Sequence, residues 1–282
     1  MNARNAIRTI VLFAPLLMVL ALAGPGWAQE EEVAKPEVRD RFGFTVGDYF
    51  FGVSSSIEWA LPDAPGDKVD WEDGLGMDAN KSTFRFDGHW RFNNKHRIDF
   101  QLFRFSRQGE TTLEEEFTWG GVTYVVGADI DARVTISYLQ AMYGYSFVNN
   151  DKWEFGFAGG LSALQFKTKI AGEAWVDETQ QEFTRESKSL TAPVPVLGPY
   201  LEWRFARNWH FDTHAYIFDA NYDKYSATFY DLMMGVRWYP TKVVGLGVNF
   251  NYEKWKVSAE DQGEVIADYK IDGWHAFLAF RF

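Results

Sequence analysis

The residues of this chain that are most able to take part in chemistry are charged side chains that recur at every second position. Between Phe84 and Phe92, for example, Arg85, Asp87 and Arg91 alternate with phenylalanine, glycine and tryptophan. Successive side chains of a β-strand point to opposite faces, so this spacing separates charged from apolar groups. The pattern predicts one inward-facing charge network: Arg85, Asp87, Arg91, Arg97, Asp99, Glu154, Glu202, Arg204, Asp212, Asp231, Arg237, Glu253 and Arg281.

The chemistry open to this network is ion pairing inside a narrow lumen. Charges confined there must pair, because an unpaired buried ion is costly. One interpretation is an interlocking ion-paired plug that sets strand register and holds the structure shut. The other is a narrow polar passage in which arginines beside short turns select small solutes. Those arginines are Arg91, Arg97, Arg204, Arg237 and Arg281.

Two histidines could instead form a metal site or a proton relay. His210 and His214 flank Asp212 at positions that share one strand face. Neighbours two apart on a strand lie about 7 Å apart, so one ion is not easily held by all three. The chain also has no cysteine, which removes disulfides and thiolate ligands. We therefore predict no metal site and no cofactor.

The spacing of these residues does not match the catalytic arrangements of known barrel enzymes. A serine nucleophile needs a neighbouring histidine base, yet the chain contains no His-x-Ser, and Tyr216 stands two residues after His214. Protease barrels place a histidine and acidic pairs near the rim, and no histidine falls in a predicted outer loop. The chain is predicted not to be an enzyme.

The elements that carry the charges are predicted to be strands. Ten segments alternate with period two: about 47–61, 81–92, 96–107, 133–147, 153–169, 194–205, 209–219, 227–239, 243–255 and 271–282. In the first of them, Tyr49, Phe51, Val53 and Ile57 are assigned outward and Asp48 inward. Short and long connections alternate, which is typical of an outer-membrane barrel with short periplasmic turns and long outer loops.

We therefore predict an all-β fold, a closed antiparallel up-and-down transmembrane β-barrel of about ten strands. The segment Phe117–Val126 also alternates and either extends two strands or forms an additional pair, so eight or twelve strands would also fit. The run Asp70–Asp78 is acidic but lacks EF-hand spacing, and we interpret it as solvated loop charge.

The two ends of the chain predict export and membrane insertion. Residues 1–28 have the basic, apolar and small-residue regions of a signal peptide, residues 29–41 form a flexible periplasmic lead, and 42–282 form the barrel domain. In the last strand, Trp274, Leu278, Phe280 and Phe282 share one face. They are the candidate assembly signal.

Composition narrows the class further. Aromatic residues make up 18% of the chain while mean hydropathy is −0.28, which excludes a helical membrane protein and suits an alternating barrel. Removing the predicted signal peptide takes away two arginines and no acid, so the net charge falls from −11 to −13. Such a surface argues against nucleic acid as a partner.

The signal peptide, strand alternation and terminal Phe282 resemble the small Gram-negative outer-membrane β-barrels of the OmpA/OmpW-like architectures, over the length from about residue 42. The segment Trp71–Gly109 also resembles one that recurs in bacterial barrels. The resemblance implies an outer-membrane location and contacts with outer-membrane lipid and lipopolysaccharide. It also implies assembly by periplasmic chaperones and the barrel-assembly machinery, which reads the last strand. It implies no activity.

A monomer is expected. Two functions stay open at this stage. One is a structural barrel or narrow passive channel for small solutes, and the other is a surface-binding or adhesion barrel that acts through its acidic outer loops.

Overall fold

The computed structural model describes residues 40–282, apart from 62–65, 120–121, 177–178, 187–189, 223–224 and 260–263, and leaves out the side chains of 173–190, 192, 222 and 225. The predicted signal peptide and residues 29–39 of the predicted lead lie outside the described residues. Within the described part, no helix is both long enough and apolar enough to cross a membrane.

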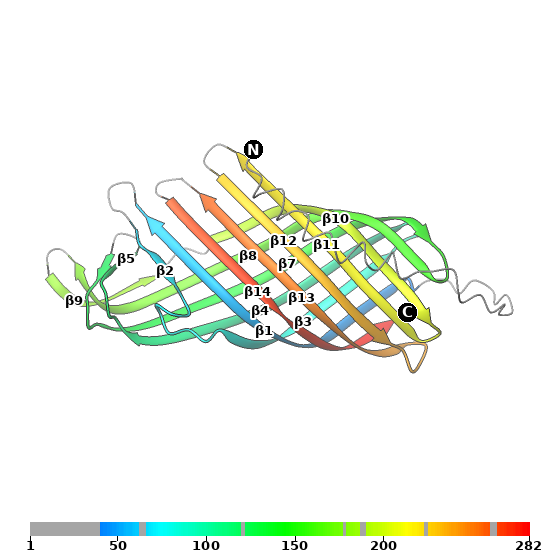
Figure 1. Ribbon diagram of the computed structural model, residues 1–282, viewed down its shortest axis with the longest axis horizontal. Helices are drawn as coiled ribbons and strands as arrows, with labels where there is room; N and C mark the ends of the chain where they lie inside the picture. The colour runs from blue at the N-terminus through cyan, green and yellow to red at the C-terminus, as the bar shows by residue number, and fades with distance from the viewer. Residues whose placement is uncertain are drawn as a thin grey trace, which may run out of the picture. The chain divides into compact units, whose positions relative to one another are not determined.

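In the part of the chain that the structure describes, ten long antiparallel strands form a closed ring in chain order (Figure 1). The ring closes because the last strand pairs with the first along its whole length. The strands are β1 (Phe42–Ala60), β3 (Asn80–Arg91), β4 (His96–Thr112), β7 (Asp129–Asn149), β8 (Trp153–Val176), β10 (Leu190–Ala206), β11 (Trp209–Tyr222), β12 (Tyr225–Trp238), β13 (Val244–Ala259) and β14 (Glu264–Arg281). The predicted fold class is confirmed, with ten strands in the ring.

Among the described residues, four short strands belong to the long connections and stay outside the ring. Strand β2 (Lys68–Asp70) pairs with β1, and β9 (Thr179–Glu186) pairs with β8. Strands β5 (Phe117–Trp119) and β6 (Val122–Tyr124) form a hairpin against β8. The alternating segment Phe117–Val126 is therefore a separate hairpin, which explains why the sequence left the strand count open.

A band of outward-facing apolar side chains surrounds the half of the ring nearest the short turns. Such a band is the lipid-facing surface of a membrane barrel. Its members include Phe42, Phe50, Phe84, Trp90, Leu102, Leu139, Tyr143, Phe147, Leu161, Leu197, Ile217, Trp238, Leu246, Trp274, Leu278 and Phe282. Inside this band the barrel surface is polar.

Beyond the band, towards the long loops, the two faces exchange character. On β4, Leu102 is 46% exposed, whereas the next residue, Phe103, is 2% exposed and points inward. On β7, Leu139 is 55% exposed and Tyr138 is 2% exposed. The strands therefore extend past the hydrocarbon, where water replaces lipid outside and apolar groups turn to the interior.

The exchange of faces corrects the assignment of the first strand. The predicted outward residues Tyr49, Phe51, Val53 and Ile57 are buried inside the barrel, and Asp48 points outward. Apolar residues occupy even positions up to Val46 and odd positions from Tyr49, so the pattern changes parity within the strand. The prediction took the longer apolar run, from Tyr49 to Ile57, as the lipid-facing one and therefore assigned the two faces of this strand in reverse.

The position of Asp48 allows a test of its assigned orientation. Its carboxylate lies in the apolar band, between Phe84 on β3 and Ala276 on β14. We expect Asp48→Leu to raise the free energy of unfolding by roughly 1–2 kcal/mol, since an acid on the lipid face is unfavourable. Urea unfolding of the chain inserted in lipid vesicles measures this. The control Ala276→Leu adds apolar area at the same level without removing a charge. A loss of stability in Asp48→Leu would contradict the assigned orientation.

Candidate functional site

The barrel interior at the short-turn end is a cluster of arginines and carboxylates. Arg237 on β12 donates from Nε to Asp212 Oδ2 at 2.7 Å, and its Nη2 lies 3.5 Å from Glu202 Oε2. Arg204 Nε lies 3.7 Å from Glu202 Oε1. Arg281 Nη1 lies 3.6 Å from Asp40 Oδ2, which ties the segment that precedes β1 to the last strand.

Glu154 on β8 is the centre of a second group that spans the interior. It is 0% exposed and accepts a hydrogen bond of 2.7 Å from Arg91 Nη2. Arg97 Nη1 lies 3.6 Å from the same carboxylate, and Arg97 Nε donates to Asp99 Oδ2 at 2.9 Å. Ser146 Oγ also donates to Glu154 at 2.7 Å. One buried carboxylate thus joins β3, β4, β7 and β8.

A third group lies farther from the short turns. Arg85 Nε donates to Asp87 Oδ1 at 2.9 Å, and Arg85 Nη1 lies 3.7 Å from Glu253 Oε1. Asp231 contacts His214 Nε2 at 3.1 Å and accepts a hydrogen bond of 2.9 Å from Gln140. The structure therefore places every residue of the predicted charge network on the inner surface, each within salt-bridge distance of an ionisable partner.

A polar cavity of about 150 Å³ lies among these groups. Its lining includes Arg85, Asp99, Gln140, Glu202, His214 and Arg237. A smaller cavity of about 10 Å³ lies nearer the short turns, between Asp40, Arg204 and Tyr239. Polar spaces of the first size hold several water molecules, which can complete the hydrogen bonding of the charged walls.

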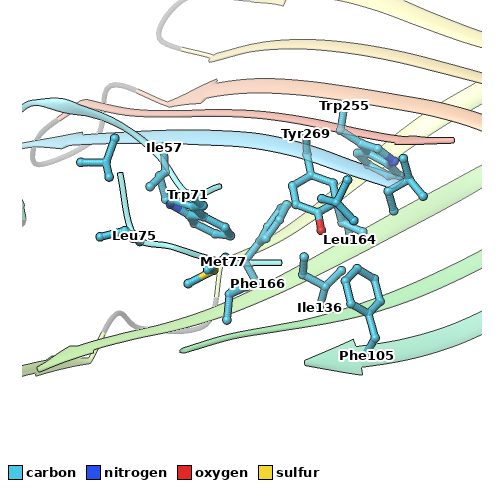
Figure 2. Close-up of a cluster of buried hydrophobic side chains, with 14 of the residues drawn as sticks. Ile57, Trp71, Leu75, Met77, Phe105, Ile136, Leu164, Phe166, Trp255 and Tyr269 are labelled. Carbon is cyan, nitrogen blue, oxygen red and sulfur yellow. The ribbon is translucent and has the colours of Figure 1, made fainter. Parts of the chain in front are cut away.

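An apolar core fills the interior on the long-loop side of the large cavity. Figure 2 shows Trp255, Tyr269, Leu164 and Ile136 pointing towards one another from β13, β14, β8 and β7. Each of these side chains is at most 1% exposed. The sequence interpretation treated the whole interior as polar and missed this core. The change of parity within single strands, such as Leu102 to Phe103, was the signal that could have revealed it.

The loop between β2 and β3 closes over this core. Trp71, Leu75 and Met77 are buried against it (Figure 2). Arg107 on β4 forms a buried ion pair with Glu72 and donates from Nε to the carbonyl oxygen of Asp78 at 3.1 Å. Glu72 therefore differs from the solvated loop charge that the sequence suggested.

Arg107 also donates from Nη1 to Ser55 Oγ on β1 at 3.0 Å. The Ser55 backbone N–H donates to Glu72 Oε2 at 2.9 Å. A single arginine, fully buried among apolar residues, thus joins β4, β1 and the loop. Because Arg107 binds both Glu72 and the carbonyl oxygen of Asp78, the loop cannot leave the interior without breaking several charge-assisted hydrogen bonds.

The predicted assembly residues lie on the outer surface of β14 and at Phe282, the residue that follows it. Trp274, Leu278 and Phe282 are strongly exposed, and Phe280 is half-buried. Their recognition by an assembly machinery stays a prediction.

Comparisons with known proteins bear on this architecture. No family model matches the chain, and a search of curated proteins finds no match. Among solved structures, the outer membrane protease OmpT from Escherichia coli matches with a TM-score of 0.52 at 10% identity, over 85% of this chain and 97% of that one. The chain has the fold of an outer-membrane β-barrel.

Two other barrels match with lower TM-scores. AlkL, solved in lipid bilayers, is 15% identical over 90% of this chain and 98% of its own, with a TM-score of 0.36. Ail of Yersinia pestis is 12% identical over 85% and 99%, with a TM-score of 0.30. These scores are too low to add to the assignment, and identities of this size concern the barrel fold alone.

The central carboxylate of the barrel provides a test of the charge network. We expect Glu154→Ala to lower the free energy of unfolding by about 3–5 kcal/mol, because it leaves Arg91 and Arg97 buried without their shared partner. Urea unfolding in lipid vesicles measures the loss. Lys270→Ala, which removes an exposed ion pair with Asp272, should cost less than about 1 kcal/mol. Equal losses in the two variants would mean that Glu154 does not organise the interior.

The arginine beneath the loop between β2 and β3 provides a second test. We expect Arg107→Ala to speed cleavage after Glu72 by a glutamate-specific protease roughly tenfold, because charge-assisted hydrogen bonds that hold the loop are lost. Cleavage of the folded barrel is followed by mass spectrometry. Arg104→Ala, an outward-facing change on the same strand, is the control. The assigned role of Arg107 is wrong if both variants are cleaved at the same rate.

Proposed function

We propose that this chain is a structural outer-membrane barrel that is closed to solutes and acts at the cell surface, not as an open passive channel. The apolar core beyond the membrane band carries this proposal. A hydrated solute would have to shed its water to pass between fully buried groups such as Phe229, Trp255 and Tyr269. Close-packed side chains of this kind leave no continuous aqueous route.

The ion-paired interior supports the same proposal. The large polar cavity lies between the apolar core and the arginine cluster around Arg204 and Arg237. Charges that already have partners gain little from a passing ion and would lose their pairing to admit it. The cavity is therefore best explained as hydrated space inside a closed wall.

The length of the strands supports a role at the surface. Strand β8 has 24 residues and β7 has 21, whereas about 9–11 residues cross a bilayer. The additional length lifts the long connections, with β2, β5, β6 and β9, away from the apolar band. A rigid stem of this kind presents loops to partners outside the cell, which agrees with the alternative of a surface-binding barrel. That the chain is not an enzyme stays a prediction.

The proposal includes the outer membrane as location. The lipid-facing band, the exposed aromatic face of β14 and the predicted signal peptide support it. On this basis the chain is inserted as a monomer, with outer-membrane lipid around it and the assembly machinery as a transient partner.

Planar-bilayer recording tests the closed state. We expect no discrete conductance steps from the purified full-length barrel, because the apolar core blocks ion passage. A barrel with Arg107→Ala should stay equally silent, since the strand-borne core persists without the loop contact. A known porin reconstituted in parallel shows that the bilayers report channels.

Steps in the unaltered protein that change in size with Arg204→Ala or Arg237→Ala would establish the channel instead. The arginines would then line the conducting path. Sucrose-gradient fractionation of cells tests the location separately, and recovery of a detergent-independent soluble species would contradict it.

A further inference from the structure

The ladder between β10 and β11 ends partway along the two strands. In the direction of the long loops, its last pair in the described part of the chain is Leu197 with Ile217, two residues of the apolar band. On their other sides both strands stay paired, β10 with β8 up to Leu190 and β11 with β12 up to Tyr222. Beyond the apolar band, β10 and β11 are therefore neighbours without a ladder between them.

Three prolines on β10 explain where the ladder ends. The Arg204 N–H donates to the carbonyl oxygen of Lys152 at 2.8 Å, so even-numbered residues of β10 direct their main-chain groups to β8. Odd-numbered residues consequently face β11, and Pro193, Pro195 and Pro199 are among them. Because proline has no N–H, β10 offers β11 no donor at these three positions.

The missing donors leave main-chain groups of β11 open. Continuing the register of the existing pairs places Pro195 opposite Asp219 and Pro193 opposite Asn221. Among the described residues, neither Asp219 nor Asn221 has a ladder partner on this side. Asp219, Ala220 and Asn221 are all exposed, although Ala220 alternates to the inner face. The end of β11 is thus an open sheet edge.

The chain covers a comparable edge elsewhere with a short strand of its own. The pairing of β1 with β3 ends at Gly52 and Asn80. Beyond that point β2 adds antiparallel to the same side of β1, with Ser56 opposite Asp70. In the part of the chain that the structure describes, no strand does this for β11. An added strand is therefore the occupant that the open edge of β11 fits.

The side chains of β11 indicate the composition of such a strand. Asp219 is exposed on the outer face and forms no ion pair with any described residue. Phe218, on the inner face, is half-buried against the apolar core. Cross-strand neighbours share a face, so an added strand would place basic side chains beside Asp219 and apolar ones beside Phe218. The net charge of −11 favours a basic partner as well.

We propose that the open edge of β11 binds an extended basic segment of a partner protein by antiparallel strand addition. The N–H and C=O groups of Asp219 and Asn221 form the main-chain hydrogen bonds, and the Asp219 carboxylate meets a basic side chain. The prolines of β10 keep that strand from occupying the edge itself. The proposal rests on the role at the cell surface proposed above, and adds to it a docking edge and a class of partner.

Two methylated peptides test the main-chain contacts on the purified full chain in a maltoside detergent. Both are fluorescently labelled and alternate lysine and valine over seven residues. One carries methyl groups on the lysine backbone nitrogens and the other on the valine backbone nitrogens, so their charge and composition are equal. In the proposed register the lysine N–H groups face Asp219 and Asn221.

We expect the lysine-methylated peptide to bind roughly 25-fold more weakly in fluorescence anisotropy. The reason is that two main-chain hydrogen bonds are lost, and each contributes about fivefold. Equal affinities, a reversed preference, or no binding of either peptide would overturn the proposal.

Variants of the two facing strands locate the site. Pro193→Thr combined with Pro195→Thr returns two donors to β10. We expect this change to extend the ladder, slow deuterium exchange of the Asp219 and Asn221 amides, and abolish binding of the valine-methylated peptide. Asn221→Pro blocks the edge directly and should weaken binding at least about fivefold. Pro240→Thr, in a short turn at the other end of the barrel, is the control and should leave binding unchanged.

Heat-modifiable migration in gels verifies that each variant is folded. Unchanged peptide binding in Asn221→Pro would overturn the proposal. Concentration-dependent self-association that Asn221→Pro abolishes would also overturn it, because the edge would then belong to a second copy of the chain. None of these measurements depends on conductance or cell fractionation, so a failure here is distinguishable from a failure of the proposed function.

Discussion

The change of surroundings along each strand is the constraint on which this structure depends. A strand that leaves the hydrocarbon meets water on its outer face, and its apolar side chains must then find burial on the other face. The same ten strands therefore form a membrane barrel with a polar interior and, without interruption, an aqueous barrel with an apolar core. Neighbouring residues such as Leu102 and Phe103 mark the boundary between them.

The two halves of the barrel bury different kinds of side chain. In the membrane half, arginines and carboxylates are removed from bulk water, and pairing around Glu154, Glu202 and Asp231 limits the cost. In the outer half, Trp255 and Tyr269 supply apolar contacts that a soluble protein would place in its centre. The cavity of about 150 Å³ lies among the ion-paired groups of the membrane half.

This division connects the fold with the proposed role. The apolar core and the Arg107 contact lie at the end of the barrel that faces the long loops. The outward side chains at that height on β4, β7 and β8 are polar. This arrangement supports the proposed role at the outer surface of the barrel.

The sequence by itself determined the barrel class, the inward position of the charge network and the outward face of β14, because alternation along a strand is a local property. It did not determine the phase of β1, where the apolar pattern changes parity between Val46 and Tyr49. Only the tertiary structure decided that Asp48 faces lipid, that Glu72 meets Arg107, and that Phe117–Val126 forms a separate hairpin. Each of these depends on what lies across the barrel or outside it. Periodicity records that the faces differ, but not which of them meets lipid, water or the opposite wall.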